Sequence, residues 1–141
     1  MRKILVGVDG SEPSVHAARM AAELASRTGA RLVLAYAIFP NLLSPTVYPD
    51  LVKQLEQDER AQANKALDDV IAKAELAALN PERLISMGAA AEVLADAAEA
   101  DKDVWMVVVG SYGRTATMRV LVGSVADRLI HICKKPVLVV R

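Results

Sequence analysis

Glycine residues gather near the end of the chain at spacings that suit contact with phosphate groups. They form the arrangement Gly110-x2-Gly113-x9-Gly123-Ser124, in which Ser124 opens a predicted helix. Glycine lets the backbone approach a phosphate closely, and the free N–H groups at a helix start attract anions. Each glycine alone is explained more simply by a turn, whereas together they favour a phosphate-binding site.

The charges of the chain are unevenly distributed. Seventeen basic and seventeen acidic side chains balance, so no overall field attracts nucleic acid or an anionic membrane. Residues 110–141 nevertheless hold six Lys or Arg against a single acidic residue, Asp127. Arg114 and Arg119 lie between the motif glycines and could donate to phosphate oxygens, although exposure to solvent explains them equally well. An anionic ligand therefore suits this last part of the chain best.

Other kinds of chemistry have little support in the sequence. The GxxxxGK[ST] phosphate loop, the GxSxG nucleophile elbow and a GxGxxG fingerprint after the first strand are all absent. His16 and His131 lie far apart and have no Cys or acidic partner at metal-ligand spacing, which predicts structural roles. We therefore expect neither catalytic residues nor a dedicated metal site, and Mg²⁺ only as a companion of a bound nucleotide.

Two kinds of segment alternate along the chain and predict the elements that position the glycines. Short runs of Val, Leu and Ile are typical of parallel strands buried on both faces, and they occupy residues 4–8, 32–38, 104–109 and 137–140. A weaker and more polar run at residues 84–87 suits a sheet edge. Longer stretches between the runs carry apolar residues three or four apart, which is the spacing of amphipathic helices.

Capping residues and prolines predict where the first two helices begin and end. Ser11 can cap a helix that runs to about Gly29, with Pro13 in its first turn and a stripe made mostly of alanine. A proline-rich loop at residues 40–49 precedes a long second helix, whose apolar stripe starts at Leu51 and which ends before Asn80-Pro81.

The remaining helices complete a regular alternation with the strands. A third helix carries Val93 and Leu94, and a fourth starts at Ser124, where Asp127 can complete a capping arrangement. Five strands and four helices in strict alternation predict one α/β domain over residues 1–141, with three layers (α/β/α), a parallel sheet and right-handed crossovers. Periodicity alone does not give the order of the strands.

Asp9 is the acidic residue at the end of the first strand. Ligands of open parallel sheets bind beyond the carboxyl ends of the strands, so a side chain at this place can face a ligand. The simpler role for Asp9 is to cap the turn that follows, although Ser11 offers a competing cap.

Composition predicts a protein of the cytoplasm. The apolar run after Met1 is too short for a signal peptide, and no run approaches the roughly 18 residues of a membrane span. The lone Cys133 cannot form an internal disulfide and is predicted to be a buried, unreactive thiol. We therefore expect no membrane partner and no nucleic acid partner.

The glycine arrangement is the same as that of the ATP-binding universal stress proteins, and the sequence resembles this family over nearly its whole length. The other matching segments are residues 4–11, 34–38 and 136–140. The resemblance implies an adenine nucleotide alpha hydrolase-like fold, a sheet order of 3-2-1-4-5 and a nucleotide between the first and fourth strands. One departure is Trp105, which stands where the family usually has an acidic residue.

The resemblance also implies which residues hold the nucleotide. Asp9 would face the adenine and ribose, and the backbone at Ala37 would hydrogen-bond the adenine edge. Together with Arg114, which is a candidate by its charge and position, the predicted nucleotide-binding residues are Asp9, Ala37, Val109, Gly110, Gly113, Gly123, Ser124 and Val125.

As a function, the resemblance implies a regulator or sensor in the stress response that binds ATP and acts as a homodimer. AMP and cyclic AMP stay open as ligands. The alternatives are slow ATP hydrolysis or phosphotransfer at the same site, and dimerisation with the site empty. The apolar last strand would lie at a sheet edge and is predicted to join the two copies through Val137, Leu138, Val139 and Val140.

Overall fold

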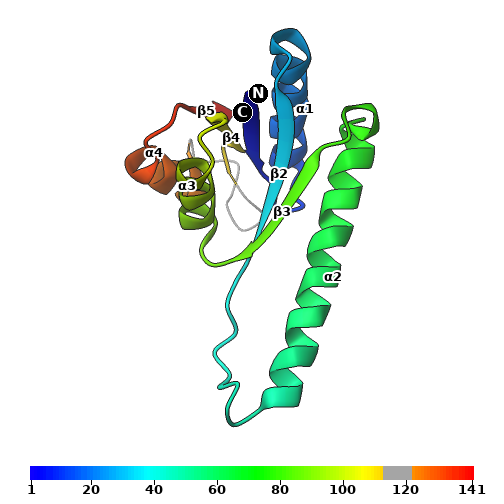
Figure 1. The fold of residues 1–141 in the computed structure, drawn as a ribbon, viewed down its shortest axis with the longest axis vertical. Helices are drawn as coiled ribbons and strands as arrows, with labels where there is room; N and C mark the ends of the chain where they lie inside the picture. Colours follow the sequence, from blue (N-terminus) through cyan, green and yellow to red (C-terminus); the bar gives the residue numbers. More distant parts are fainter. Residues whose placement is uncertain (113–121) are drawn as a thin grey trace.

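A five-stranded parallel sheet forms the centre of the computed structural model, which describes residues 1–112 and 122–141 (Figure 1). The strand order is β3-β2-β1-β4-β5, which confirms the expected 3-2-1-4-5 sheet. The strands are β1 (Lys3–Gly7), β2 (Arg31–Ile38), β3 (Glu82–Met87), β4 (Val104–Gly110) and β5 (Val137–Val140).

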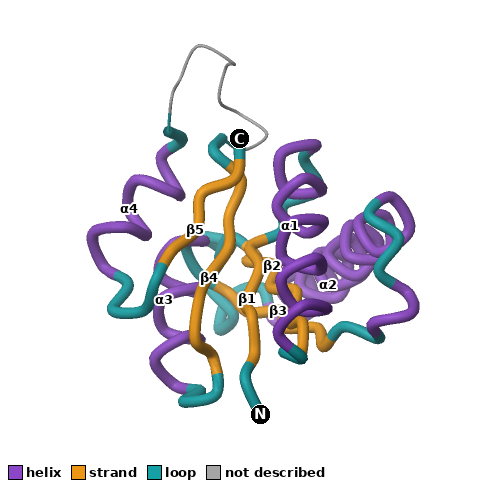
Figure 2. Tube along the Cα trace, turned by 90° about the horizontal axis from the view of Figure 1, so that it is seen from above, coloured by secondary structure: helices purple, strands orange, loops and turns teal. Residues whose placement is uncertain are grey.

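Four α-helices cover the two faces of this sheet and confirm the predicted three-layer arrangement. Figure 2 shows two of them on one face and two on the other. The first pair is α1 (Glu12–Thr28) and α2 (Pro49–Lys73), and the second pair is α3 (Ala90–Ala100) and α4 (Ser124–Ile132). None of the helices within the described part of the chain is both long and apolar enough to cross a membrane.

The first helix begins and ends at the residues that the sequence predicts. The Ser14 N–H donates a hydrogen bond to the Ser11 hydroxyl at 3.3 Å, so Ser11 caps one of the free donors of the first turn. Pro13 occupies that turn, where a missing N–H costs nothing. Gly29 ends the helix with a φ of 71°, a left-handed conformation that glycine adopts without strain.

The core consists of one apolar layer on each face of the sheet. On the side of α1 and α2, Ile4, Val6 and Leu34 of the strands pack in one cluster with Leu67 of α2. The opposite layer joins the other faces of the same strands to α3 and α4, and its members include Leu5, Val107, Leu94 and Leu129. Both faces of the central strands are therefore buried, as the unbroken apolar runs predict.

The second helix differs from the prediction in the start of its apolar stripe. Val52 is buried, whereas Leu51 is 47% exposed, so the first turn of α2 presents Val52 and not Leu51 to the rest of the molecule. The helix ends at Lys73, ahead of Asn80-Pro81 as predicted. Glu75 follows with a left-handed φ of 57°, which interrupts the helix before a short 3₁₀ turn at Ala77–Leu79.

An ion-pair cluster ties the amino end of β1 to its neighbours. The Lys3 ammonium donates to the Asp101 carboxylate at 2.9 Å and lies 3.5 Å from the Glu82 carboxylate. The hydrogen bond to Asp101 raises the pKa of Lys3, and Glu82 adds to the effect. The same bond, assisted by the Asp103 backbone N–H at 3.0 Å, lowers the pKa of Asp101.

The lowered pKa of Asp101 makes stability depend on pH in a defined direction. A carboxyl group whose pKa is lower in the folded state stabilises the fold above its ordinary pKa and loses this contribution as the pH falls through the folded value. We expect Asp101→Asn to unfold more easily at neutral pH and to lose less stability than the parent below about pH 4. Urea unfolding at a series of pH values measures this, and parallel pH profiles for the two proteins would contradict it.

Gly110 lies where the end of β4 meets the first turn of α1. A side-chain carbon at this position would lie 2.9 Å from the backbone carbonyl group of Pro13, which is closer than such atoms approach in real structures. The contact is with backbone, so it cannot be relieved by turning a side chain. The packing of β4 against α1 therefore requires glycine here, independently of any ligand.

We expect Gly110→Ala to destabilise the fold by about 1–3 kcal/mol, the usual cost of forcing an extra methyl group into close packing. Chemical denaturation should show a lower unfolding midpoint with an unchanged dependence on denaturant. A midpoint equal to that of the parent would show that the end of β4 does not pack as tightly against α1 as described.

Candidate nucleotide-binding site

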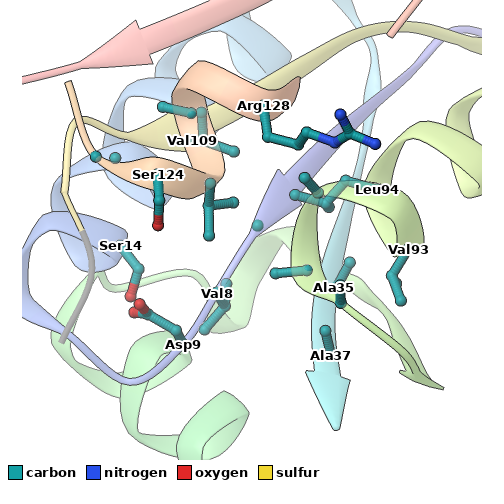
Figure 3. A pocket seen from close by; sticks show the side chains of 18 of the residues that line it. Val8, Asp9, Ser14, Ala35, Ala37, Val93, Leu94, Val109, Ser124 and Arg128 are labelled. Atoms are coloured by element: carbon teal, nitrogen blue, oxygen red, sulfur yellow. The ribbon is translucent and has the colours of Figure 1, made fainter. Parts of the chain in front are cut away.

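A cavity of about 550 Å³ lies at the carboxyl ends of β1, β2 and β4, between the starts of α3 and α4 (Figure 3). This is the edge of a parallel sheet at which ligands are expected. The volume falls within the range of known small-molecule sites, roughly 300–1,000 Å³.

The cavity exists because the residues beneath it are small. Gly7, Ala35 and Ala37 supply the strand floor, and Ala91 and Ala126 face it from the helices. A side-chain carbon added to Gly7 would lie 2.8 Å from the Leu94 side chain, so that side of the cavity is already closely packed. The alternation of alanine in β2 is the sequence signal for this hollow, and it was not part of the prediction.

Asp9 lines the cavity and also shapes the turn after β1. Its Oδ1 accepts a hydrogen bond from the Ser11 backbone N–H at 2.9 Å, the geometry of an Asx turn. The capping role considered for this residue is therefore confirmed, and its contact with a ligand stays a prediction that its place in the cavity allows. The other carboxylate oxygen makes no hydrogen bond to any of residues 1–112 or 122–141.

The start of α4 corrects one prediction. The N-cap residue is Gly123, with extended backbone (φ −70°, ψ 164°), and no side chain caps the helix. Ser124 is instead the first residue of the helix and Asp127 forms no capping arrangement with it, because the extended conformation required of an N-cap falls on the glycine. The exposed Ser124 side chain and the uncapped N–H groups therefore face the cavity together.

A backbone hydrogen bond brings the two glycine segments together. The Gly123 N–H donates to the Ser111 carbonyl oxygen, and the Ser111 N–H donates to the Val140 carbonyl oxygen at 2.8 Å. The end of β4, the start of α4 and the end of β5 are thereby held at one corner of the cavity.

Seven of the nine predicted nucleotide-binding residues line this one cavity. They are Asp9, Ala37, Val109, Gly110, Gly123, Ser124 and Val125. Gly113 and Arg114 lie outside the described residues, as does Arg119.

The wall formed by α3 was not predicted. Gly88, Ala89 and Ala90 line the cavity at the turn from β3 into α3, and Val93 follows one turn later. A run of glycine and alanine after the third strand was visible in the sequence. It carries no charge or motif, so only the folded arrangement reveals that it faces the other strand ends.

The charged residues of the cavity do not by themselves attract an anion. Arg128 of α4 donates from Nε to the Glu92 carboxylate of α3 at 3.0 Å, and this bond lowers the pKa of Glu92. Asp9 adds a second carboxylate. Hydroxyl groups of Ser11, Ser14, Tyr112 and Ser124 also line the cavity. Among the described residues, the Ser124 hydroxyl lies together with the backbone N–H groups at the start of α4, a combination that suits a phosphate.

Metal-binding side chains are sparse in the described structure. No three His, Cys, Asp or Glu residues come together across residues 1–112 and 122–141. Cys133, predicted to be buried, is half-buried at the end of α4 and carries a free thiol. The arrangement of the cavity suits binding through backbone, hydroxyl and apolar contacts.

Known proteins are similar to this chain in sequence and in fold. A universal stress protein of Mycolicibacterium smegmatis is 38% identical over 143 residues, which are 97% of this chain and 47% of the relative. The chain thus spans about half the length of that protein. Universal stress protein UspA from Lactobacillus plantarum has a similar structure, with a TM-score of 0.84, 26% identity, and coverage of 99% of this chain and 97% of the other.

A second solved structure is a universal stress protein in complex with cAMP. Its TM-score is 0.68 and its identity 25%, with 99% of this chain and 96% of the other covered. The model of the universal stress protein family matches residues 1–141. With the family match running through every strand and helix around the cavity, this chain belongs to the universal stress protein family.

Proposed function

We propose that the chain binds an adenine nucleotide, foremost ATP, in the cavity above β1, β2 and β4, and acts as a regulator or sensor in the cytoplasm. The observation that carries the proposal is the meeting of an uncapped helix start with an apolar, small-residue hollow in one space. The first suits phosphate and the second suits a planar base. The structural relative solved with cAMP supports an adenine nucleotide as the ligand class.

The backbone of β2 suits recognition of the base. The pairing of β1 with β2 ends at Gly7 opposite Ala35, whereas β2 continues to Ile38. Backbone groups alternate in direction along a parallel strand, so those of Ala37 point to the side where β1 has ended. They are then available for the edge of an adenine, which presents both a donor and an acceptor.

The opposite end of the cavity suits the phosphates. Ser124 and Val125 begin α4, and their N–H groups point toward the helix start with its positive dipole. Asp9 lies between the two ends and can accept from a ribose hydroxyl or meet a phosphate-bound Mg²⁺ through water. Gly113 and Arg114 complete the proposed phosphate contacts by their place in the glycine arrangement.

Removal of the Ser124 hydroxyl tests the phosphate contact. A hydrogen bond to a charged group contributes about 1.5–3 kcal/mol, so Ser124→Ala should weaken ATP binding by about tenfold to 150-fold in calorimetric titration. Adenosine, which lacks phosphates, should bind both proteins equally. The Ser124 side chain is exposed and does not cap α4, so its truncation leaves the fold intact.

Ser26→Ala is the matched control, because Ser26 is an exposed serine of α1 that does not line the cavity formed by the described residues. It should bind ATP as the parent does. Absence of binding of ATP, AMP and cyclic AMP to the parent protein would refute the proposed function itself.

We also propose that two copies pair through β5. This strand is at the edge of the sheet, and all four of its residues are only half-buried. The carbonyl group of Pro136 accepts a hydrogen bond from Val107 of β4, and that of Val140 accepts one from Ser111, which follows β4. Backbone groups alternate in direction along a strand, so those of Val137 and Val139 point to the free edge. An apolar edge with unpaired backbone favours pairing with a second strand.

Val139→Pro tests this pairing. Proline removes the outward N–H at the free edge and leaves the hydrogen bonds to β4 in place, a position that edge strands tolerate. Light scattering at micromolar concentration should show a dimer for the parent and a shift toward monomer for the variant. A monomeric parent, or a variant as dimeric as the parent, would argue against pairing through β5.

A further inference from the structure

Phe39 is a large aromatic residue that is exposed to solvent. It is the single phenylalanine of the chain, its surface is 78% exposed, and it lines the proposed nucleotide cavity. Leaving such a ring in water is unfavourable, and a ligand that covered it would recover the cost. The position of this ring is therefore informative about what the cavity binds.

The backbone beside Phe39 is held in place. The Gly88 N–H donates to the Ile38 carbonyl oxygen at 2.8 Å, which continues the contact between β2 and the turn into α3. Ala37 precedes Phe39 by two residues, and Figure 3 shows Ala37 at the end of β2, beside α3. Phe39 thus lines the cavity at the end where the backbone of Ala37 would meet the edge of a base.

The surroundings of this end of the cavity suit a flat apolar ligand. Gly88 and Ala89 line it from the turn into α3, Ala90 and Val93 line it from the start of α3, and none of the four brings a polar side-chain atom. These small residues leave space in which a planar base could bind beside Phe39. Stacking of a base on an aromatic side chain contributes about 1–3 kcal/mol and needs no hydrogen bond from the side chain.

We infer that Phe39 is a base-stacking residue, which covers the adenine ring while the backbone of Ala37 reads its edge. This inference rests on the proposed function and adds the residue that supplies affinity for the base. Phosphate contacts at Ser124 and base contacts at Phe39 then lie at opposite ends of one ligand. Phe39 binds every adenine nucleotide alike, whatever its phosphate chain.

A competing explanation for the exposure of Phe39 is contact with another protein. Leu42, Val47, Tyr48 and Leu51 follow in the sequence and are also exposed, and together with Phe39 they could form an apolar surface. Of these residues, only Phe39 lines the cavity made by the described part of the chain. The two explanations therefore predict different effects for neighbouring substitutions.

The test compares Phe39→Ala with Leu42→Ala, a matched change at a fully exposed apolar residue three positions on. Calorimetric titration should show binding weakened by about 5-fold to 150-fold in Phe39→Ala, and by the same factor for ATP and for AMP. Leu42→Ala should bind both nucleotides as the parent does. Phe39→Tyr, which keeps an aromatic face, should retain most of the affinity.

A second measurement reports the stacking directly. Phe39→Trp places an indole at the rim of the cavity, and its fluorescence should be quenched by ATP and AMP but not by inorganic triphosphate. Trp105 lies near the amino end of β4, whereas the cavity is at the carboxyl ends of the strands. Its fluorescence is therefore a constant background, which is measured in the parent protein.

The possible outcomes distinguish failure of the inference from failure of the function on which it rests. If the parent binds ATP and Phe39→Ala binds it equally well, the stacking role is wrong and the proposed function stands. A loss seen with ATP but not with AMP would also overturn it, because the base is common to both. If the parent binds no adenine nucleotide, the proposed function and the inference fail together.

Discussion

Right-handed crossovers determine where this protein can hold a ligand. From β1 the chain moves through β2 to β3 with α1 and α2 on one face, and then returns to β4 and β5 with α3 and α4 on the other. The winding therefore reverses between β1 and β4. At that reversal the helices leave the sheet on opposite faces, and the carboxyl ends of the strands stay open. The cavity, the uncapped start of α4 and Asp9 all occupy this opening.

Small residues convert the opening into a usable volume, and they serve packing at the same time. Gly110 belongs to the glycine arrangement, yet its contact with the Pro13 backbone already excludes a side chain. Gly7 is closed in by Leu94 in the same way. A glycine motif of this kind combines requirements of the fold with requirements of the ligand, so substitution of Gly110 would test both together. Ser124 and Phe39 separate them, because both side chains are exposed and neither is needed by the core.

The fold was predictable where local signals and burial agree. Apolar runs, the Ser11 cap and Gly29 gave the strands and the first helix because these features act within a few residues. The cap of α4 was assigned one residue too late, since both Gly123 and Ser124 can serve as a cap and only the backbone conformation distinguishes them. The exposure of Leu51 and the part of the cavity wall formed by α3 could be predicted only with knowledge of the tertiary structure. Neither the burial of Val52 in place of Leu51 nor the meeting of Glu92 with Arg128 is encoded at short range.

The balance of charge in the cavity has a consequence for how the proposed ligand would be recognised. Arg128 is engaged by Glu92, and Asp9 adds a further negative charge. Within the described residues, affinity for a nucleotide would therefore come from backbone donors, hydroxyl groups and the apolar contacts of the base. Backbone dipoles at a helix start act over a short range, so they favour a phosphate group at one position more than a high total charge. By the proposed function, a site of this construction would recognise the adenine first and would distinguish nucleotides by where their phosphates reach Ser124.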